Sequence, residues 1–209
     1  MAKRLTAQDW IDFALQTLAR DGFEALKADV LARKLGVSRG SFYWHFTELA
    51  DFHARVIAHW RRTATDAIIA DLEGAPRAAR LDILLRRAFS HSGALELRMR
   101  AWADHNAQAA DALRDIDRRR CAYIERMLAD EGVAPEIATM RAQILYWTYL
   151  GAALSRTKLQ GTALKRMVEE LGRIGLGNPI GSPVAGAARL RPRRPRGKAG
   201  AKAGAKAGD

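Results

Sequence analysis

A helix that ends in glycine and runs into a short aromatic segment carries the most chemical information in this chain. Gly36 can adopt the left-handed backbone conformation that ends a helix, and Ser38 can cap the helix that follows. Arg39 opens that second helix, where a guanidinium can donate two hydrogen bonds to O6 and N7 of one guanine. Residues 36–46 therefore predict a helix-turn-helix whose second helix enters the major groove of DNA.

The flanking sequence predicts the helices that hold this segment in place. Thr6 and Asp9 resemble a capping box, so a first helix is expected to begin near Thr6 and to end before Gly22. Apolar residues at helical spacing predict a second helix over residues 28–35. Thr47 can then cap a long fourth helix, which would join this three-helix head to the rest of the chain.

Four short segments occur in the order and spacing of a known family. They are Gly22-Phe23-Glu24-Ala25, Leu31-Ala32, Gly36-Val37-Ser38-Arg39-Gly40 and Phe42-Tyr43-Trp44-His45-Phe46. Together they resemble the N-terminal signature of TetR-family transcriptional regulators, over roughly the first 55 residues. This resemblance implies an all-helical homodimer that represses transcription until a small ligand binds its C-terminal domain.

The resemblance also implies a set of DNA contacts. The residues from 39 to 41 fall where the family reads base edges, and those from 43 to 45 fall where it contacts phosphates and sugars. Tyrosine, tryptophan and neutral histidine can donate to phosphate oxygens, which sets the register but carries no sequence information. The predicted DNA-binding residues are Lys27, Arg39, Gly40, Ser41, Tyr43, Trp44 and His45. The alternatives are that the three aromatic side chains among them pack in the core and that Arg39 is a solvated surface charge.

The chain departs from the family pattern at the start of two helices. Lys27 and Ala28 stand where the family commonly has threonine and a larger apolar residue, so Asp29 is expected to cap this helix instead. Leu49 stands where the family commonly has a lysine, which removes one expected phosphate contact. DNA affinity is therefore expected to depend on other basic groups.

The positive charge of the chain is concentrated at its end. The net charge is +12, and residues 178–209 hold eight Lys or Arg against a single acid, whereas residues 1–60 are nearly neutral. Prolines and Ala-Lys-Ala-Gly repeats leave almost no large apolar side chain to bury there, so the tail is predicted to be disordered. It is expected to attract DNA without sequence preference, the alternative being a tail that only aids solubility.

Other classes of function find little support in the sequence. No glycine-rich phosphate loop follows a predicted strand, no HExxH pair occurs, and Cys and His do not cluster at metal-ligand spacing, so no enzymatic activity, cofactor or metal is expected. The single cysteine, Cys121, fits a reducing compartment, with helix packing favoured over redox sensing as its role. The most apolar stretch, residues 144–154, is too short to span a bilayer, and a cytoplasmic, nucleoid-associated location is expected.

Five further helices are expected between the head and the tail. Pro135 suits the first turn of one of them, and apolar residues spaced by three and four follow it. The last helix, opened by Thr162, carries a second apolar stripe. In the resembled family the final two helices pair with those of a second subunit, although a stripe alone does not say whose helix it meets. The predicted dimer interface comprises Ile144, Trp147, Gly151, Leu154, Leu164, Met167, Val168 and Leu171.

Aromatic and methionine residues of the central helices predict a ligand pocket. Its predicted lining comprises Phe89, Met99, Trp102, Tyr123, Tyr146 and Trp147. Tyr149 belongs to the same wider set, and His91, His105 or Arg100 are candidate polar anchors. Such side chains at helical spacing usually pack against one another, so no more than two or three of them are expected to touch a small apolar effector.

The sequence as a whole predicts an all-α protein. The expected parts are a helix-turn-helix head (1–55), a helical ligand-binding and dimerisation bundle entered through a long connector helix (56–177), and a disordered basic tail (178–209). The expected function is a ligand-relieved transcriptional repressor that binds a pseudo-palindromic DNA operator as a homodimer. The alternative is an architectural DNA-coating protein in which the head binds weakly and the tail provides most of the affinity.

Overall fold

The computed structural model describes residues 5–90, 93–155 and 159–177, and these residues form helices joined by turns, without a strand. They belong to one compact unit, Met1–Gly177. The predicted all-α fold is confirmed for this part of the chain. The second unit, Asn178–Asp209, lies outside the described residues, so the disordered basic tail stays a prediction.

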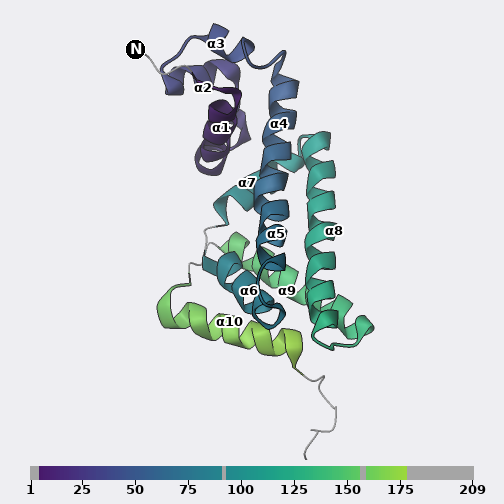
Figure 1. Ribbon diagram of the computed structural model, residues 1–209. Coiled ribbons are helices and arrows are strands. Elements are labelled where there is room, and N and C mark those ends of the chain that lie inside the picture. The colour runs from purple at the N-terminus through teal and green to yellow at the C-terminus, as the bar shows by residue number, and fades with distance from the viewer. Residues whose placement is uncertain (1–4, 91–92, 156–158, 178–209) are drawn as a thin grey trace, which may run out of the picture. The chain divides into compact units, whose positions relative to one another are not determined.

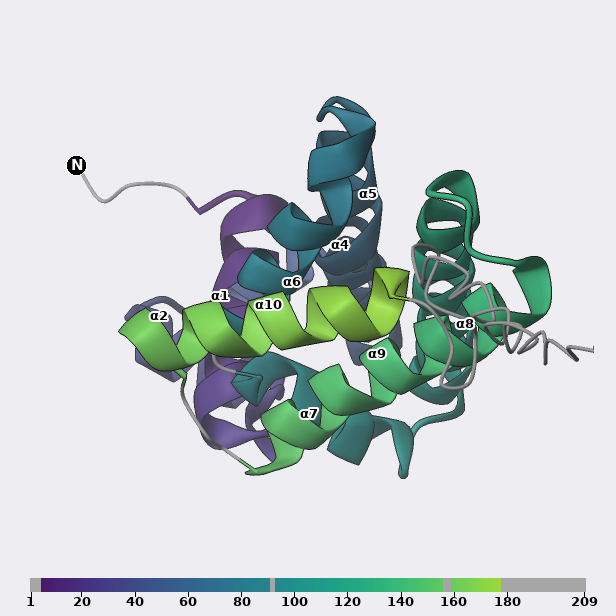
Figure 2. The same ribbon diagram turned by 90° about the horizontal axis from the view of Figure 1, so that it is seen from below.

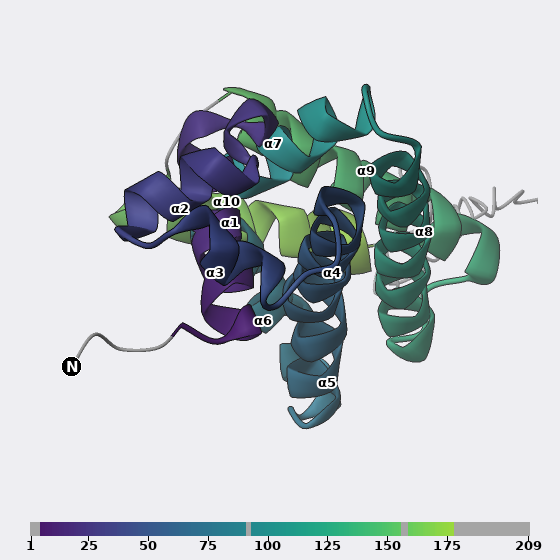
Figure 3. The same ribbon diagram turned by 90° about the horizontal axis from the view of Figure 1, so that it is seen from above.

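Three helices and one 3-10 turn make up the head (Figure 3). Their bounds are α1 Ala7–Asp21, η1 Phe23–Ala25, α2 Ala28–Leu35 and α3 Arg39–Tyr43. The predicted capping box is present, because Thr6 N donates to Asp9 Oδ2 at 2.7 Å and Asp9 N donates to Thr6 Oγ1 at 3.2 Å. Gly22 and Gly36 follow α1 and α2 with φ of 86° and 68°, a region that favours glycine.

Three predicted side-chain caps are wrong. Ser38 stands at the N-cap position of α3, but its hydroxyl makes no capping hydrogen bond. Glu48, not Thr47, is the N-cap of the fourth helix. Asp29 lies inside α2, where its carboxylate pairs with Arg33 at 3.6 Å. A side-chain cap contributes only about 1 kcal/mol, so burial of the neighbouring aromatic side chains is sufficient to hold these turns without one.

The connector is drawn as one continuous helical rod in Figure 1, but a π-helical turn interrupts its hydrogen-bonding pattern. The connector consists of α4 Leu49–Arg61, the π-turn η2 Arg62–Asp66 and α5 Ala67–Glu73. The sequence predicts a long helix here, and its apolar period does not reveal the wider turn. π-turns inserted in α-helices occur mostly at functional sites.

Five more helices follow the connector within the described residues. Their bounds are α6 Arg80–Ser90, preceded by the 3-10 turn η3 Arg77–Ala79, then α7 Ala94–Ala103, α8 Ala107–Asp130, α9 Pro135–Ser155 and α10 Gly161–Leu176. Pro135 opens α9 as predicted, whereas α10 has Gln160 as its N-cap and holds Thr162 inside its first turn. α10 packs against α6 and α9 (Figure 2).

Two clusters of buried side chains organise these helices. The first joins Trp10, Phe42 and Phe52 of the head to Met99 and Trp102 of α7. The second lies among α5, α6, α8, α9 and α10. Because α7 completes the core of the head, the head is not an independent cluster, and the boundary at residue 55 stays a prediction.

Candidate nucleic-acid interface and ligand pocket

Two buried phenylalanines fix the orientation of α3. Phe42 and Phe46 are almost fully buried, and the Phe42 ring meets the rings of Trp10 and Phe52 at centroid distances of 5.4 and 5.0 Å. Aromatic pairs in this geometry add to the free energy gained by burial. The remaining residues of α3 are therefore turned away from the core.

The side chains on the other side of α3 face solvent. Arg39 and Gly40 are exposed, Tyr43 is 45% exposed and Trp44 is 72% exposed. Trp44 therefore does not join the core, and the packing alternative is wrong for this residue. Ser41 and His45 are half-buried, while Lys27 is exposed at the start of α2 with its ammonium 3.3 Å from Glu24.

Arg39 differs from the other basic residues of the head in its partners. Among the described residues 5–55, every other Lys and Arg lies within 4.0 Å of a carboxylate. Arg39 instead donates through Nη2 to the Tyr43 hydroxyl at 3.1 Å, with its guanidinium 5.4 Å from the centre of the Tyr43 ring. Its charge is not neutralised by a neighbour, so it is the cation of the described head most available to DNA.

A cavity of about 340 Å³ lies in the body, alongside the connector. This volume is within the range of small-molecule sites. The connector, α6, α7, α8 and α9 contribute its walls, which are mostly aliphatic and aromatic. Of the predicted pocket residues, Phe89, Tyr123 and Tyr146 line it, as does Tyr149 from the wider set.

The other predicted pocket residues lie elsewhere. Met99 and Trp102 are buried in the first cluster, where α7 turns them toward the head. Trp147 is 63% exposed, because it stands on the outer face of α9. Among the candidate anchors, His105 stacks on Phe23 at a centroid distance of 5.7 Å, and His91 lies outside the described residues.

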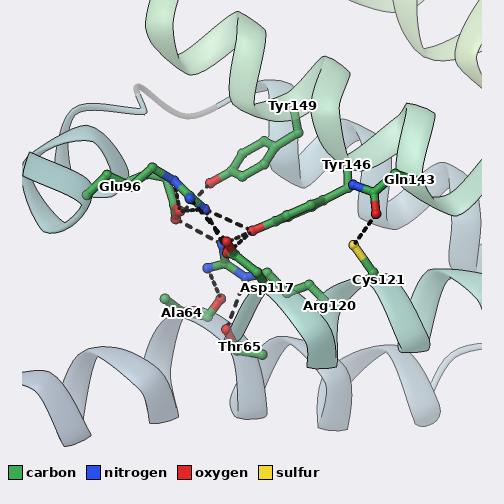
Figure 4. Close-up of polar contacts among 10 residues, drawn as sticks. Ala64, Thr65, Glu96, Asp117, Arg120, Cys121, Gln143, Tyr146 and Tyr149 are labelled. Carbon is green, nitrogen blue, oxygen red and sulfur yellow. Dashed lines mark hydrogen bonds and ion pairs between the residues drawn. The ribbon is translucent and has the colours of Figure 1, made fainter. Parts of the chain in front are cut away.

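Two arginines and two carboxylates form a partly buried polar cluster (Figure 4), and two of its members, Glu96 and Arg120, line the cavity. Glu96, only 5% exposed, accepts from Arg120 Nη1 at 2.9 Å and from Arg100 Nη2 at 2.8 Å. Arg100 also donates to Asp117 at 2.8 Å, and the Tyr146 hydroxyl donates to the same carboxylate at 2.6 Å. Of this cluster, only Tyr146 and Arg100 are among the residues predicted from the sequence, since Glu96, Asp117 and Arg120 belong to no motif.

The arginines of the cluster and the tyrosines beside it keep their ordinary ionisation states at neutral pH. Burial by itself would lower the pKa of Arg120 and of Arg100, but the neighbouring carboxylates more than offset this and the pKa of each is raised. Burial and the nearby Glu96 raise the pKa of Tyr149 to about 12, and burial likewise raises the pKa of Tyr146. Both arginines are therefore charged and both phenols are neutral.

Arg120 also holds the π-turn of the connector. Its Nε donates to Thr65 Oγ1 at 3.1 Å and its Nη2 donates to the carbonyl oxygen of Ala64 at 3.1 Å. Thr65 is buried, and both acceptors line the cavity. One side chain therefore connects the polar end of the cavity to the helix that leads to the head.

An apolar stripe is exposed on α9 and continues on α10. Of the predicted dimer residues, Ile144, Trp147, Gly151, Leu154 and Met167 are exposed. Val168 and Leu171 are instead buried in the second core cluster, and Leu164 packs against it, because α10 turns that face toward α6 and α9. The stripe also includes two exposed residues missing from the predicted set, Met140 and Ile174, which lie seven residues from Trp147 and Met167 and so share their helix faces.

Cys121 is half-buried, and burial raises the pKa of its thiol. A raised thiol pKa disfavours the reactive thiolate, which agrees with a packing role. Within the described residues no group of three or more His, Cys, Asp or Glu could hold a metal ion, and no helix is long and apolar enough to cross a membrane.

Comparison with known proteins agrees with the head and with the fold. Residues 11–48 match the family model of bacterial regulatory proteins of the tetR family. Similar structures include Escherichia coli NemR in its reduced form (TM-score 0.67, 17% identity, 83% of this chain and 98% of that chain). A TetR transcription regulator from Haloarcula marismortui gives a TM-score of 0.62 at 17% identity (81% and 95%). A transcriptional regulator from Rhodococcus sp. Rha1 gives a TM-score of 0.63 at 17% identity, over 81% of this chain and 96% of that chain. No curated protein matches the sequence.

Motif, head geometry and fold together define a helix-turn-helix, DNA-binding transcriptional regulator, a class of protein distinct from enzymes. Residues 11–48 carry the DNA-binding region of the tetR family, as the resemblance of the first helices predicts, and the described residues as a whole have the fold of the regulators named above.

Proposed function

We propose that this regulator is a repressor that binds a pseudo-palindromic operator as a homodimer and leaves it when a small apolar ligand occupies the cavity. The observation that carries the proposal is the connector. Its first part, α4, packs against α1 of the head, and its π-turn forms a wall of the cavity. A change at the cavity can therefore reach the head through one continuous helical segment.

Reading of the operator is assigned to the exposed side of α3. Arg39 is proposed to contact a guanine, with Gly40 and Ser41 allowing close approach to base edges. Tyr43, Trp44 and His45 are proposed to contact phosphates and sugars, together with Lys27. The exposure of Lys27, Arg39, Gly40, Tyr43 and Trp44 supports these roles, as does the lack of an ion pair within 4.0 Å for Arg39 among the described residues.

Dimerisation is assigned to the stripe on α9 and α10. Ala142, Leu145 and Tyr146 bury one face of α9, whereas Ile144 and Trp147 leave the opposite face apolar and exposed. A helix that is apolar on both faces is usually covered on both, and contiguous exposed apolar side chains commonly mark an interface. A twofold pair of heads would then match two half-sites about one DNA turn apart.

The first experiment is sequencing of genomic fragments retained by the purified protein at physiological salt. The full chain is compared with a chain that ends at Gly177, the last residue of the first compact unit. A few sharp, twofold-symmetric sites retained by both would support the proposed repressor. Diffuse retention that disappears with the tail would favour an architectural DNA-coating protein instead, since binding to phosphates alone has no sequence preference.

A further inference from the structure

Charge at the cavity is confined to one end. Among the described residues that line it, only Arg87, Glu96 and Arg120 carry formal charges. Arg87 donates to Asp71 at 2.9 Å, so its charge is already compensated. The ionic character of a ligand is therefore decided by Glu96 and Arg120.

The polar cluster that contains these two residues is electrically balanced. Two guanidinium groups, from Arg100 and Arg120, face two carboxylates, from Glu96 and Asp117. Each oxygen of Glu96 already accepts from a different arginine, Oε1 from Arg100 and Oε2 from Arg120. An ionic ligand would thus add a charge that no buried group compensates, and such a charge is strongly unfavourable away from water.

Neither sign of charge has a vacant place in the cluster. An anion could reach Arg120 only by displacing Glu96, whose buried carboxylate would then lie beside it and repel it. A cation would need an aromatic face near Glu96, but Arg120 itself lies over the rings of Trp60 and Tyr149, 5.8 and 5.9 Å from their centres.

A neutral oxygen, in contrast, meets suitable partners. The Tyr149 hydroxyl donates to Glu96 only at 3.4 Å, which is long for a hydrogen bond, so it can turn to another acceptor. The Tyr123 ring also lines the cavity, and its hydroxyl lies close enough to Glu73 for that carboxylate to help raise its pKa. At about 30 Å³ for each water-sized group, the cavity holds roughly eleven non-hydrogen atoms.

We infer that the cavity binds an uncharged, largely apolar molecule with a single hydroxyl or carbonyl group, a ligand class that follows from the balanced Arg100–Glu96–Arg120–Asp117 cluster at its end. This inference rests on the proposed ligand-relieved function. It excludes fatty acids, amines and quaternary ammonium compounds of similar size as preferred ligands.

The test compares three probes that differ only in their head group: 1-decanol, decanoate and decylammonium. Binding to the full-length protein is measured by calorimetry, with decanol below its aqueous solubility limit and the two ions below their micellar concentrations. Retention of an operator fragment is measured in parallel without any probe. The expected result is a Kd for decanol on the order of tenfold or more below that of either ion.

Charge variants of the cluster provide the sharper control. Glu96→Gln leaves two guanidiniums against one carboxylate and should shift the preference toward decanoate by about tenfold. Arg120→Gln leaves two carboxylates against one guanidinium and should shift the ligand preference toward decylammonium. This variant provides a second test if Glu96→Gln fails to fold. Arg86→Ala, on an exposed arginine that pairs with Asp82 outside the cavity, should leave the preference unchanged.

Equal or tighter binding of either ion by the unaltered protein would overturn the inference while leaving the cavity as a ligand site. An unchanged order of preference in the folded charge variants would overturn the role of the cluster. No binding of any probe would overturn both the ligand class and the ligand site. Operator retention in the parallel assay would still stand as evidence for DNA binding.

Discussion

The residues proposed to read DNA differ from the other residues of the head in the contacts that their side chains make. Phe42 and Phe46 are buried in the core. Apart from Arg39, the Lys and Arg side chains of the described head are paired with carboxylates. Arg39 is left with a phenol as its partner, and exchanging that contact for a guanine costs little because the Tyr43 hydroxyl can then bond to water or phosphate. At the scale of single residues, specificity is therefore expected to depend on Arg39 more than on any other cation of the head.

Arg39→Ala should weaken binding to the operator by about 1–3 kcal/mol and relax the base preference at one position, because a bidentate contact to guanine is lost. The measurement is a titration of operator and random DNA at fixed salt. Arg86→Ala removes the same charge from the body and controls for the long-range field. Equal losses on both DNAs for Arg39→Ala would mean that this side chain touches only phosphate.

At the scale of elements, the connector makes polar contacts with both the body and the head. Arg120 of α8 holds its π-turn by hydrogen bonds to Thr65 and Ala64. In α4, the first part of the connector, His53 Nε2 donates to the carbonyl oxygen of Leu26 at 2.9 Å. The centre of its ring lies 5.1 Å from the centre of the Trp102 ring of α7. The same helix is thus fastened both to the cavity and to the head.

Thr65→Val should lower the free energy of unfolding by about 1–3 kcal/mol, since it leaves a buried guanidinium hydrogen bond unmade at nearly constant volume. Urea denaturation measures this. Thr63→Val lies in the same π-turn with an exposed side chain and should change stability by no more than about 0.5 kcal/mol. Equal effects of the two variants would argue that Arg120 does not hold the turn.

Stability should also depend on pH through His53. Burial lowers its pKa below the ordinary value of 6.5, so the folded protein binds fewer protons there than the unfolded chain. The contribution of His53 is therefore complete above pH 6.5 and is lost as the pH falls below it. Thermal melting between pH 7.5 and 5.5 should show this decline, and His53→Gln should make it shallower. A decline as steep in the variant would assign it to other groups.

At the scale of the whole molecule, none of the described residues covers the apolar stripe on the outer face of α9 and α10. Trp147, at 63% exposure, is the most prominent side chain of this stripe after Leu154 by exposed fraction and the largest by volume. Buried tryptophans often dominate the free energy of protein–protein association. The proposed dimer is thus expected to depend on this residue.

Trp147→Glu should raise the dimer dissociation constant by about 30-fold or more, the equivalent of the roughly 2 kcal/mol expected for a central interface residue. Sedimentation across a concentration series measures it. Ile83→Glu places the same charge on another exposed apolar side chain, on α6 outside the stripe, and should leave the dimer intact. A monomer at micromolar concentration in the unaltered protein would count against the dimer itself.

What the sequence determined by itself is the local architecture of the head. Thr6 and Gly36 act on backbone atoms within a few residues, so their types predict where helices begin and end, and the spacing of Phe42 and Phe46 predicts which side of α3 is buried. The failed caps at Ser38 and Thr47 show the limit of such signals, because a weak side-chain hydrogen bond is readily replaced by packing.

Only the tertiary structure decided how the faces of the body helices are shared among core, cavity and surface. An apolar residue at helical spacing is compatible with each of these places, so its spacing alone does not predict which one it occupies. Met99 and Trp102 were predicted in the pocket but pack in the core of the head, and Val168 and Leu171 were predicted at the dimer interface but pack in the core of the body. The pairing of Glu96 with Arg120 had no sequence signal either. This ion pair joins α7 and α8. Which faces of these helices meet is set by many contacts between residues far apart in the sequence, so no local pattern predicts it.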